Sequence, residues 1–157
     1  MTTLTLAHAT KNSIGNEWIS LHRKAETARL AGQIDDAYNF LLGALEAAEQ
    51  FDSYDPRLII TFDALAQVAE VRRNFAVAVT YVKWSIHLKL RVLGAGNRLV
   101  IGDVRKLVRL YVRLGNWERA KTFAELADVC RIEGPECAIT CGQFPRANSS
   151  SIGASYA

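Results

Sequence analysis

A short pattern recurs three times along the chain, and it constrains the fold more than any other feature. Leu30–Ala37 reads LAGQIDDA, Val71–Ala78 reads VRRNFAVA and Leu114–Ala120 reads LGNWERA. Each copy has a small or polar turn, then an apolar residue, then an alanine about three residues later; the final alanines are 41 and 42 residues apart. Self-similarity at a fixed period indicates a repeat architecture. Such a fold typically presents a binding surface rather than a reaction centre.

Hydrophobic periodicity predicts six helices, because apolar residues recur every three or four positions. We place them at Asn16–Ala31, Ile34–Phe51, Pro56–Arg72, Phe75–Leu93, Arg98–Leu114 and Trp117–Glu133. Asp55 precedes Pro56, so an N-cap carboxylate and a proline at the first helical position are expected. Gly94–Asn97 and Gly134-Pro135 are stop signals.

The three copies of the pattern divide the chain into three helix pairs, at residues 16–55, 56–97 and 98–134. Ala44, Ser85 and Ala127 come seven residues after the alanines of the pattern, where small side chains would let helices approach closely. We expect residues 1–15 to form a flexible arm and residues 135–157 a flexible tail. Part of that tail, residues 137–144, would act as a partial cap on the last helix, where Phe123, Leu126 and Ile132 suggest an apolar outer side.

This pattern resembles the tetratricopeptide repeat, and the third copy is the best match through Leu107–Tyr111, Leu114–Trp117, Ala120 and Ala127. The period is longer than usual and is similar to the long-helix variant of kinesin light chains. Arg73 departs from the family pattern, because glycine is common at that position. The resemblance implies an all-α, right-handed α-solenoid of three antiparallel helix pairs whose first helices line a concave groove. It implies a non-catalytic adaptor or scaffold that binds a protein segment in the groove and needs no cofactor.

By the resemblance, the groove carries one set of side chains from each pair. These candidate partner-binding residues are His22, Glu26, Arg29, Asp63, Gln67, Glu70, Arg105, Arg109 and Arg113.

The three arginines follow one another at intervals of four residues, so they share a helix face. Arginine forks bind carboxylates through two parallel hydrogen bonds. We therefore predict that an acidic or C-terminal segment of a partner binds Arg105, Arg109 and Arg113. The competing interpretation is a solvated helix face without a ligand. The lysine–asparagine clamp with which some family members hold a C-terminal carboxylate is absent, because His22 and Glu26 occupy its first-helix positions.

Charge is distributed unevenly although the net charge is only +3. Three basic and eight acidic residues in 16–55 give −5, six and two in 56–97 give +4, and eight and five in 98–134 give +3. Such asymmetry affects partners and association rates rather than the fold. A nucleic-acid binder using the basic half is one alternative, although no recurring aromatic or base-reading set accompanies the charge. An architectural subunit that associates, or self-associates, through the solenoid ends is another.

The sequence contains no Gly-rich phosphate loop, no nucleophile elbow and no acid–base pair with catalytic spacing, so we expect no enzymatic activity. It has no secretory signal and no apolar stretch long enough to span a membrane, which favours a cytoplasmic location. Cys130, Cys137 and Cys141 lack the spacing and the fourth ligand of a structural zinc site. We expect reduced cysteines, with Cys130 a small buried residue.

The tryptophans Trp18, Trp84 and Trp117 are candidates for ligand stacking or for packing. Trp117 begins a second helix at the position that Ile34 and Phe75 hold in the other pairs, so we predict that it packs in the core. Trp18 lies on the outermost helix, where it caps the end of the stack or meets a partner.

Overall fold

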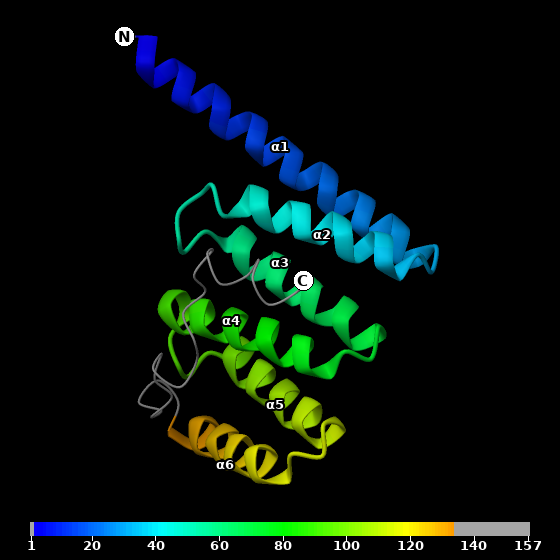
Figure 1. The fold of residues 1–157 in the computed structure, drawn as a ribbon. Coiled ribbons are helices and arrows are strands. Elements are labelled where there is room, and N and C mark those ends of the chain that lie inside the picture. The colour runs from blue at the N-terminus through cyan, green and yellow to red at the C-terminus, as the bar shows by residue number, and fades with distance from the viewer. Residues whose placement is uncertain (1, 134–157) are drawn as a thin grey trace.

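The structure, a computed structural model, describes residues 2–133 of the 157-residue chain, with side chains from residue 10 to residue 130. Its regular elements in this part are all helices: α1 (Thr2–Leu30), α2 (Ile34–Ala48), α3 (Pro56–Val71), α4 (Phe75–Leu93), α5 (Arg98–Arg113) and α6 (Trp117–Glu133). Consecutive helices pack against each other, and Figure 1 shows them stacked in chain order from α1 to α6. No helix of this part combines the length and apolar character that a membrane span requires.

The predicted helices agree with the structure except at the beginning of the chain. α4 and α6 have the predicted bounds, and α2, α3 and α5 end up to three residues early. α1 begins at Thr2 instead of Asn16, so the residues expected to form an arm belong to this helix. Gly15 lies inside this helix although glycine is a poor helix former. The helix continues through it, with Phe51 and Arg57 in van der Waals range of its Cβ position.

The turns from α1 to α2, from α3 to α4 and from α5 to α6 share one backbone geometry. Gly32, Arg73 and Gly115 have positive φ values of 77°, 59° and 70°. The backbone N–H of each of these residues donates to the carbonyl three residues earlier, and the N–H of the next residue donates to the carbonyl five residues earlier. The first set of hydrogen bonds is Gly32 to Arg29, Arg73 to Glu70 and Gly115 to Val112. The second set is Gln33 to Ala28, Asn74 to Ala69 and Asn116 to Tyr111. This is the Schellman arrangement, which satisfies the last carbonyls of a helix. The sequence pattern thus corresponds to a repeated local structure.

Polar residues cap the start of most helices after the first. Asp55 accepts a hydrogen bond from the backbone N–H of Arg57 at 2.9 Å, and Asn97 does the same for Leu99 at 2.9 Å. Asn74 caps α4 in the same way. These side chains satisfy N–H groups that have no partner within the helix. The predicted start of α3 at Asp55-Pro56 is confirmed.

The alanines of the pattern lie in the core. Ala37, Ala78 and Ala120 are 0%, 0% and 5% exposed, and small residues at these positions let the two helices of a pair approach closely. The positions seven residues later, Ala44, Ser85 and Ala127, are also buried. Small buried residues therefore recur at equivalent positions of α2, α4 and α6.

Two predictions about apolar side chains are wrong. Trp117 is 65% exposed. Its equivalent Phe75 is partly covered by Arg113 of the next pair, with the guanidinium 5.6 Å from the ring centroid, whereas no described helix follows α6. Phe123 and Leu126 do not form an outer face, because they are half-buried against the core, and Phe123 stacks on Tyr111 at 5.5 Å. Ile132 and the predicted cap at residues 137–144 fall outside the described side chains.

Candidate functional site

The predicted groove residues lie on α1, α3 and α5. Contacts between side chains join these three helices. The Nε2 atom of His22 on α1 lies 3.0 Å from Oγ1 of Thr61 on α3. The carboxylate of Glu70 on α3 forms an ion pair with Lys106 on α5. His22, Glu26, Arg29 and Gln67 together line a depression of about 70 Å³. A space of this size accommodates little more than water.

His22 is held in place by a buried hydroxyl. The Oγ1 atom of Thr61 donates to the carbonyl of Arg57 at 2.7 Å and accepts from the indole N–H of Trp18 at 3.0 Å. Because its single hydrogen is used, Thr61 must accept from the Nε2–H of His22. Burial lowers the pKa of His22, which favours this neutral tautomer. Trp18 and His22 are thus both bonded to Thr61 on α3, and the prediction that Trp18 caps the stack or meets a partner stays untested.

Glu26 and Arg29 are paired with each other. Arg29 donates through Nε at 2.9 Å and through Nη2 at 2.6 Å to the two carboxylate oxygens of Glu26. The hydrogen bond from Arg29 lowers the pKa of Glu26. Since both side chains are solvent-exposed, the pair adds little to stability, but it leaves neither charge free.

Asp63 belongs to an ion cluster centred on the buried ammonium group of Lys89. The Nζ of Lys89, on α4, lies 2.8 Å from Asp63 Oδ2 and also contacts Asp103 on α5, and Lys89 is only 5% exposed. Ser85 donates to the other oxygen of Asp63 at 2.6 Å. Burial lowers the pKa of Lys89, but hydrogen bonds to Asp103 and Asp63 outweigh this effect and leave it raised. The cluster ties α3, α4 and α5 together.

Glu70 is also paired. Its Oε1 lies 3.0 Å from Nζ of Lys106. Of the three α3 groove candidates, the two carboxylates Asp63 and Glu70 are therefore bound to lysines, and Gln67 remains as an exposed neutral side chain.

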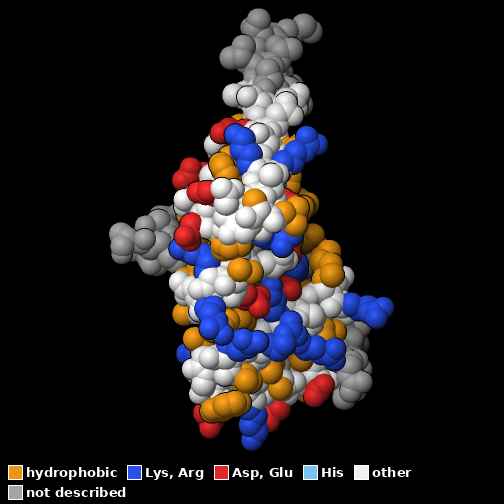
Figure 2. Space-filling view, turned by 90° about the vertical axis from the view of Figure 1, so that its right-hand side faces the viewer, with side chains coloured by type: hydrophobic (Ala, Val, Ile, Leu, Met, Phe, Trp, Pro, Cys, Tyr) orange, Lys and Arg blue, Asp and Glu red, His pale blue; other side chains and the backbone are white. Residues whose placement is uncertain are grey.

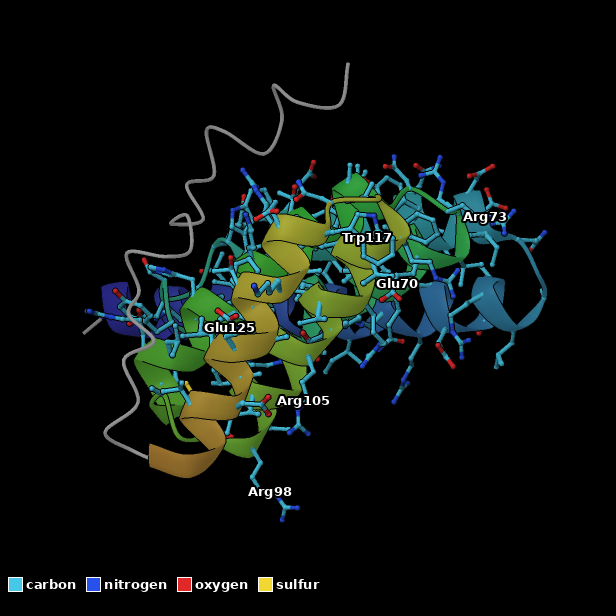
Figure 3. All side chains as sticks on the ribbon, turned by 90° about the horizontal axis from the view of Figure 1, so that it is seen from below. Glu70, Arg73, Arg98, Arg105, Trp117 and Glu125 are labelled. Carbon is cyan, nitrogen blue, oxygen red and sulfur yellow. The ribbon has the colours of Figure 1, made fainter. Side chains whose placement is uncertain are left out.

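The α5 arginines differ from these neighbours. Arg105, Arg109 and Arg113 are all exposed, and none forms an ion pair with a described residue. Figure 2 shows a band of Lys and Arg side chains across the lower half of one face, and Figure 3 shows Arg98 and Arg105 projecting away from α5. The three arginines thus have no carboxylate partner among the described residues, whereas the nearby carboxylates Asp63 and Glu70 are paired with lysines.

A pocket of about 460 Å³ lies at one end of this row. It is formed by the end of α3, the start of α4 and the last turns of α5. Its charged lining residues are Glu70, Arg73, Arg109 and Arg113, and its apolar lining includes Val71, Phe75 and Val112. An apolar surface beside several guanidinium groups can hold an apolar side chain and anionic groups together.

Sequence reasoning missed three of the residues that shape this region. Arg73 was visible as the one non-glycine residue at the left-handed position of the three turns. Lys89 and Asp103 had no local signal, because their pairing depends on which helices lie side by side. A further depression of about 680 Å³ between α1 and α2, lined by Arg23, Lys24 and Phe40 among others, was not predicted either.

Cys130 is fully buried, as predicted, but it is disulfide-bonded. The expectation of a reduced thiol at this position is therefore wrong. Cys137 and Cys141 lie outside the described residues.

No family model, no curated protein and no solved structure matches the chain. Its function must therefore be inferred from the arrangement of its own residues.

Proposed function

We propose that the chain is a non-catalytic protein-interaction module, a helical repeat of the tetratricopeptide type that binds an acidic segment of a partner protein. The observation that carries the proposal is the row of exposed arginines Arg105, Arg109 and Arg113. Lys89 is paired with Asp63 and Lys106 with Glu70, whereas the arginine row has no carboxylate partner among the described residues. An unpaired row of like charges is available to a ligand.

The spacing of the row suits an extended peptide. Successive arginines are four residues apart on a helix, a rise of about 6 Å. Alternate side chains of an extended segment lie about 6.6 Å apart on one face. A segment with acidic residues at alternate positions could therefore meet the arginines in order. Each guanidinium offers a planar pair of donors to a carboxylate.

The repeat assignment is supported by the three equivalent turns and the three buried alanines Ala37, Ala78 and Ala120. In such repeats the first helices, here α1, α3 and α5, line the binding face. Contacts of His22 with Thr61 and of Glu70 with Lys106 keep these helices adjacent. The arginine row belongs to the third of them.

One observation favours a second role, as an architectural subunit that assembles through the end of the stack. Trp117 and Leu114, beside the turn between α5 and α6, are 65% and 44% exposed. Aromatic residues of this kind are enriched at protein interfaces. An end-on partner would bury them without using the arginine row.

The test is a selection from a random-peptide display library on the wild-type protein, followed by affinity measurement for the strongest enriched peptide. We expect enrichment of Asp and Glu at alternate positions. The double variant Arg105→Glu/Arg109→Glu should lose at least about tenfold in affinity. The matched control, Arg23→Glu/Lys24→Glu, reverses two exposed charges on α1 and should bind as the wild type does.

The outcomes separate the candidate functions. Enriched peptides without acidic residues, or equal affinity for the wild type and the α5 double variant, would overturn the proposal. Binding abolished by Trp117→Ser but unaffected by the α5 substitutions would favour the architectural role. Binding of single-stranded RNA with a steep salt dependence, in the absence of peptide binding, would favour a nucleic-acid binder.

A further inference from the structure

Arg73 has the left-handed backbone conformation that glycine has at the equivalent position of the other two turns. Its φ is 59°, compared with 77° for Gly32 and 70° for Gly115. A side chain with a Cβ atom is sterically disfavoured in the left-handed region, and glycine is not. The chain therefore carries a local strain at one of three equivalent turns. Strained residues of this kind cluster at functional sites.

The side chain of Arg73 contributes no ion pair to the described fold. Its neighbour Arg72 does: Arg72 Nε lies 3.1 Å from Oδ1 of Asp35, and its guanidinium lies 4.6 Å from the centroid of the Tyr38 ring. Arg72 thus joins α2 to the end of α3. Arg73, one residue later, is exposed and lines the pocket at the end of the arginine row.

The pocket remains basic because its acidic residue is engaged. Arg73, Arg109 and Arg113 line it together with Glu70, whose carboxylate is bound by Lys106 at 3.0 Å. Three guanidinium groups are therefore opposed by a single carboxylate, and that carboxylate is already paired. The charge of the pocket is complementary to an anionic segment.

The apolar part of the pocket limits which anionic segment fits. Val71 is 57% exposed and Val112 is 40% exposed, and Phe75 also lines the pocket. Binding is favoured when an apolar side chain of a ligand covers these exposed aliphatic groups, because apolar surface is then removed from water. A run of acidic residues alone would leave this surface in contact with water.

We propose that Arg73 is a specificity-determining residue of the peptide site, and that the pocket binds an aliphatic side chain flanked by carboxylates. The carboxylates pair with Arg73 on one side and with Arg109 and Arg113 on the other. This inference rests on the proposed function and adds that the acidic peptide carries an aliphatic residue between its carboxylates. The strain at Arg73 is the structural cost of placing a third arginine at the pocket.

The test measures stability and affinity on the same variants, with the strongest acidic peptide from the display selection as the probe. Arg73→Gly should raise the Tm by a few degrees and weaken peptide binding about tenfold. Arg73→Asn, which tolerates the left-handed conformation, should weaken binding to a similar extent without lowering the Tm. Gly115→Arg is the matched control: it introduces the same strain at an equivalent turn, and should lower the Tm without improving affinity.

Replacing the aliphatic residue of the peptide by serine should weaken its binding to the wild type. Unchanged affinity in Arg73→Gly would overturn the inference, while an affinity that still depends on Arg105 would leave the proposed function standing. A Tm that falls by several degrees in both Arg73 variants would also overturn it, because Arg73 would then serve the fold. If no acidic peptide is enriched at all, both proposals fail together.

Discussion

The Nζ of Lys106 lies 3.0 Å from Oε1 of Glu70, and this contact decides the charge of the pocket beside it. Glu70 lies on α3 and Lys106 on α5, so the pair also joins the first helices of the second and third pairs. Both side chains are partly buried. Without Lys106, the Glu70 carboxylate would be free to pair with an arginine of the pocket.

We predict that Lys106→Met weakens acidic-peptide binding while changing stability by less than about 1 kcal/mol, since partly exposed ion pairs contribute little. Isothermal titration calorimetry and urea unfolding measure the two effects. The double variant Glu70→Gln/Lys106→Met should recover the affinity, because the competing carboxylate is gone. Equal affinities for the wild type and Lys106→Met would show that Glu70 does not compete with the ligand.

A second prediction concerns the buried cluster of Lys89, Asp63 and Asp103. Lys89→Met leaves two carboxylates without their cation, and loss of one partner of a buried pair costs about 3 kcal/mol or more. Urea unfolding should show this loss in the free energy of unfolding. The control is Lys121→Met on the exposed surface of α6, expected within about 0.5 kcal/mol of the wild type. A similar small change for Lys89→Met would mean that the cluster is not a significant tie between α3, α4 and α5.

The third prediction is a pH dependence that originates at His22. Burial lowers its pKa in the folded state below the ordinary value of 6.5, so the unfolded chain takes up the proton first as the pH falls. The stability associated with neutral His22 is fully present above pH 6.5 and is lost as the pH falls through the folded-state pKa.

Urea unfolding of the wild type and of His22→Gln between about pH 8 and pH 5 tests this window. Glutamine can donate to Thr61 but does not titrate, so the variant should lose less stability than the wild type on acidification. Because the two proteins share every other titratable group, the difference between the two curves is the quantity to compare. Parallel curves would contradict the prediction, because they would show that protonation of His22 does not change the free energy of unfolding.

The fourth prediction separates Trp117 from Trp84. Trp117→Ser should change the free energy of unfolding by less than about 0.5 kcal/mol, because the side chain is 65% exposed. Trp84→Ala should cost about 3 kcal/mol or more, because Trp84 is buried and packs against Phe62 and Tyr81. Acrylamide quenching should lose its most accessible component in Trp117→Ser. A large destabilisation by Trp117→Ser would show that residues beyond α6 cover it.

The helices were predictable because their signals are local. Pro56 and Asp55 begin α3 through backbone chemistry that involves a few neighbouring residues, and the recurring turns end their helices in the same way. The predicted start of the first helix at Asn16 was wrong, and α1 continues through Gly15 because a single glycine lowers helix propensity by only about 1 kcal/mol. The prediction that Trp117 is buried failed for a different reason. Trp117 and Phe75 both begin a helix, but Phe75 is partly covered by Arg113 of α5, whereas Trp117 is exposed.

The sequence by itself determined the positions of the helices, the left-handed turn residues, the small residues at the helix contacts and the arginine row on α5. These features depend on backbone geometry and on the period of the helix, which act over a few residues. Only the tertiary structure decided which charges remain free. Asp63, Glu70, Lys89 and Lys106 are neutralised by partners on other helices, and Arg73 joins Arg109 and Arg113 at one pocket. Electrostatic pairing depends on distance in space, and that distance is set by how the helices stack.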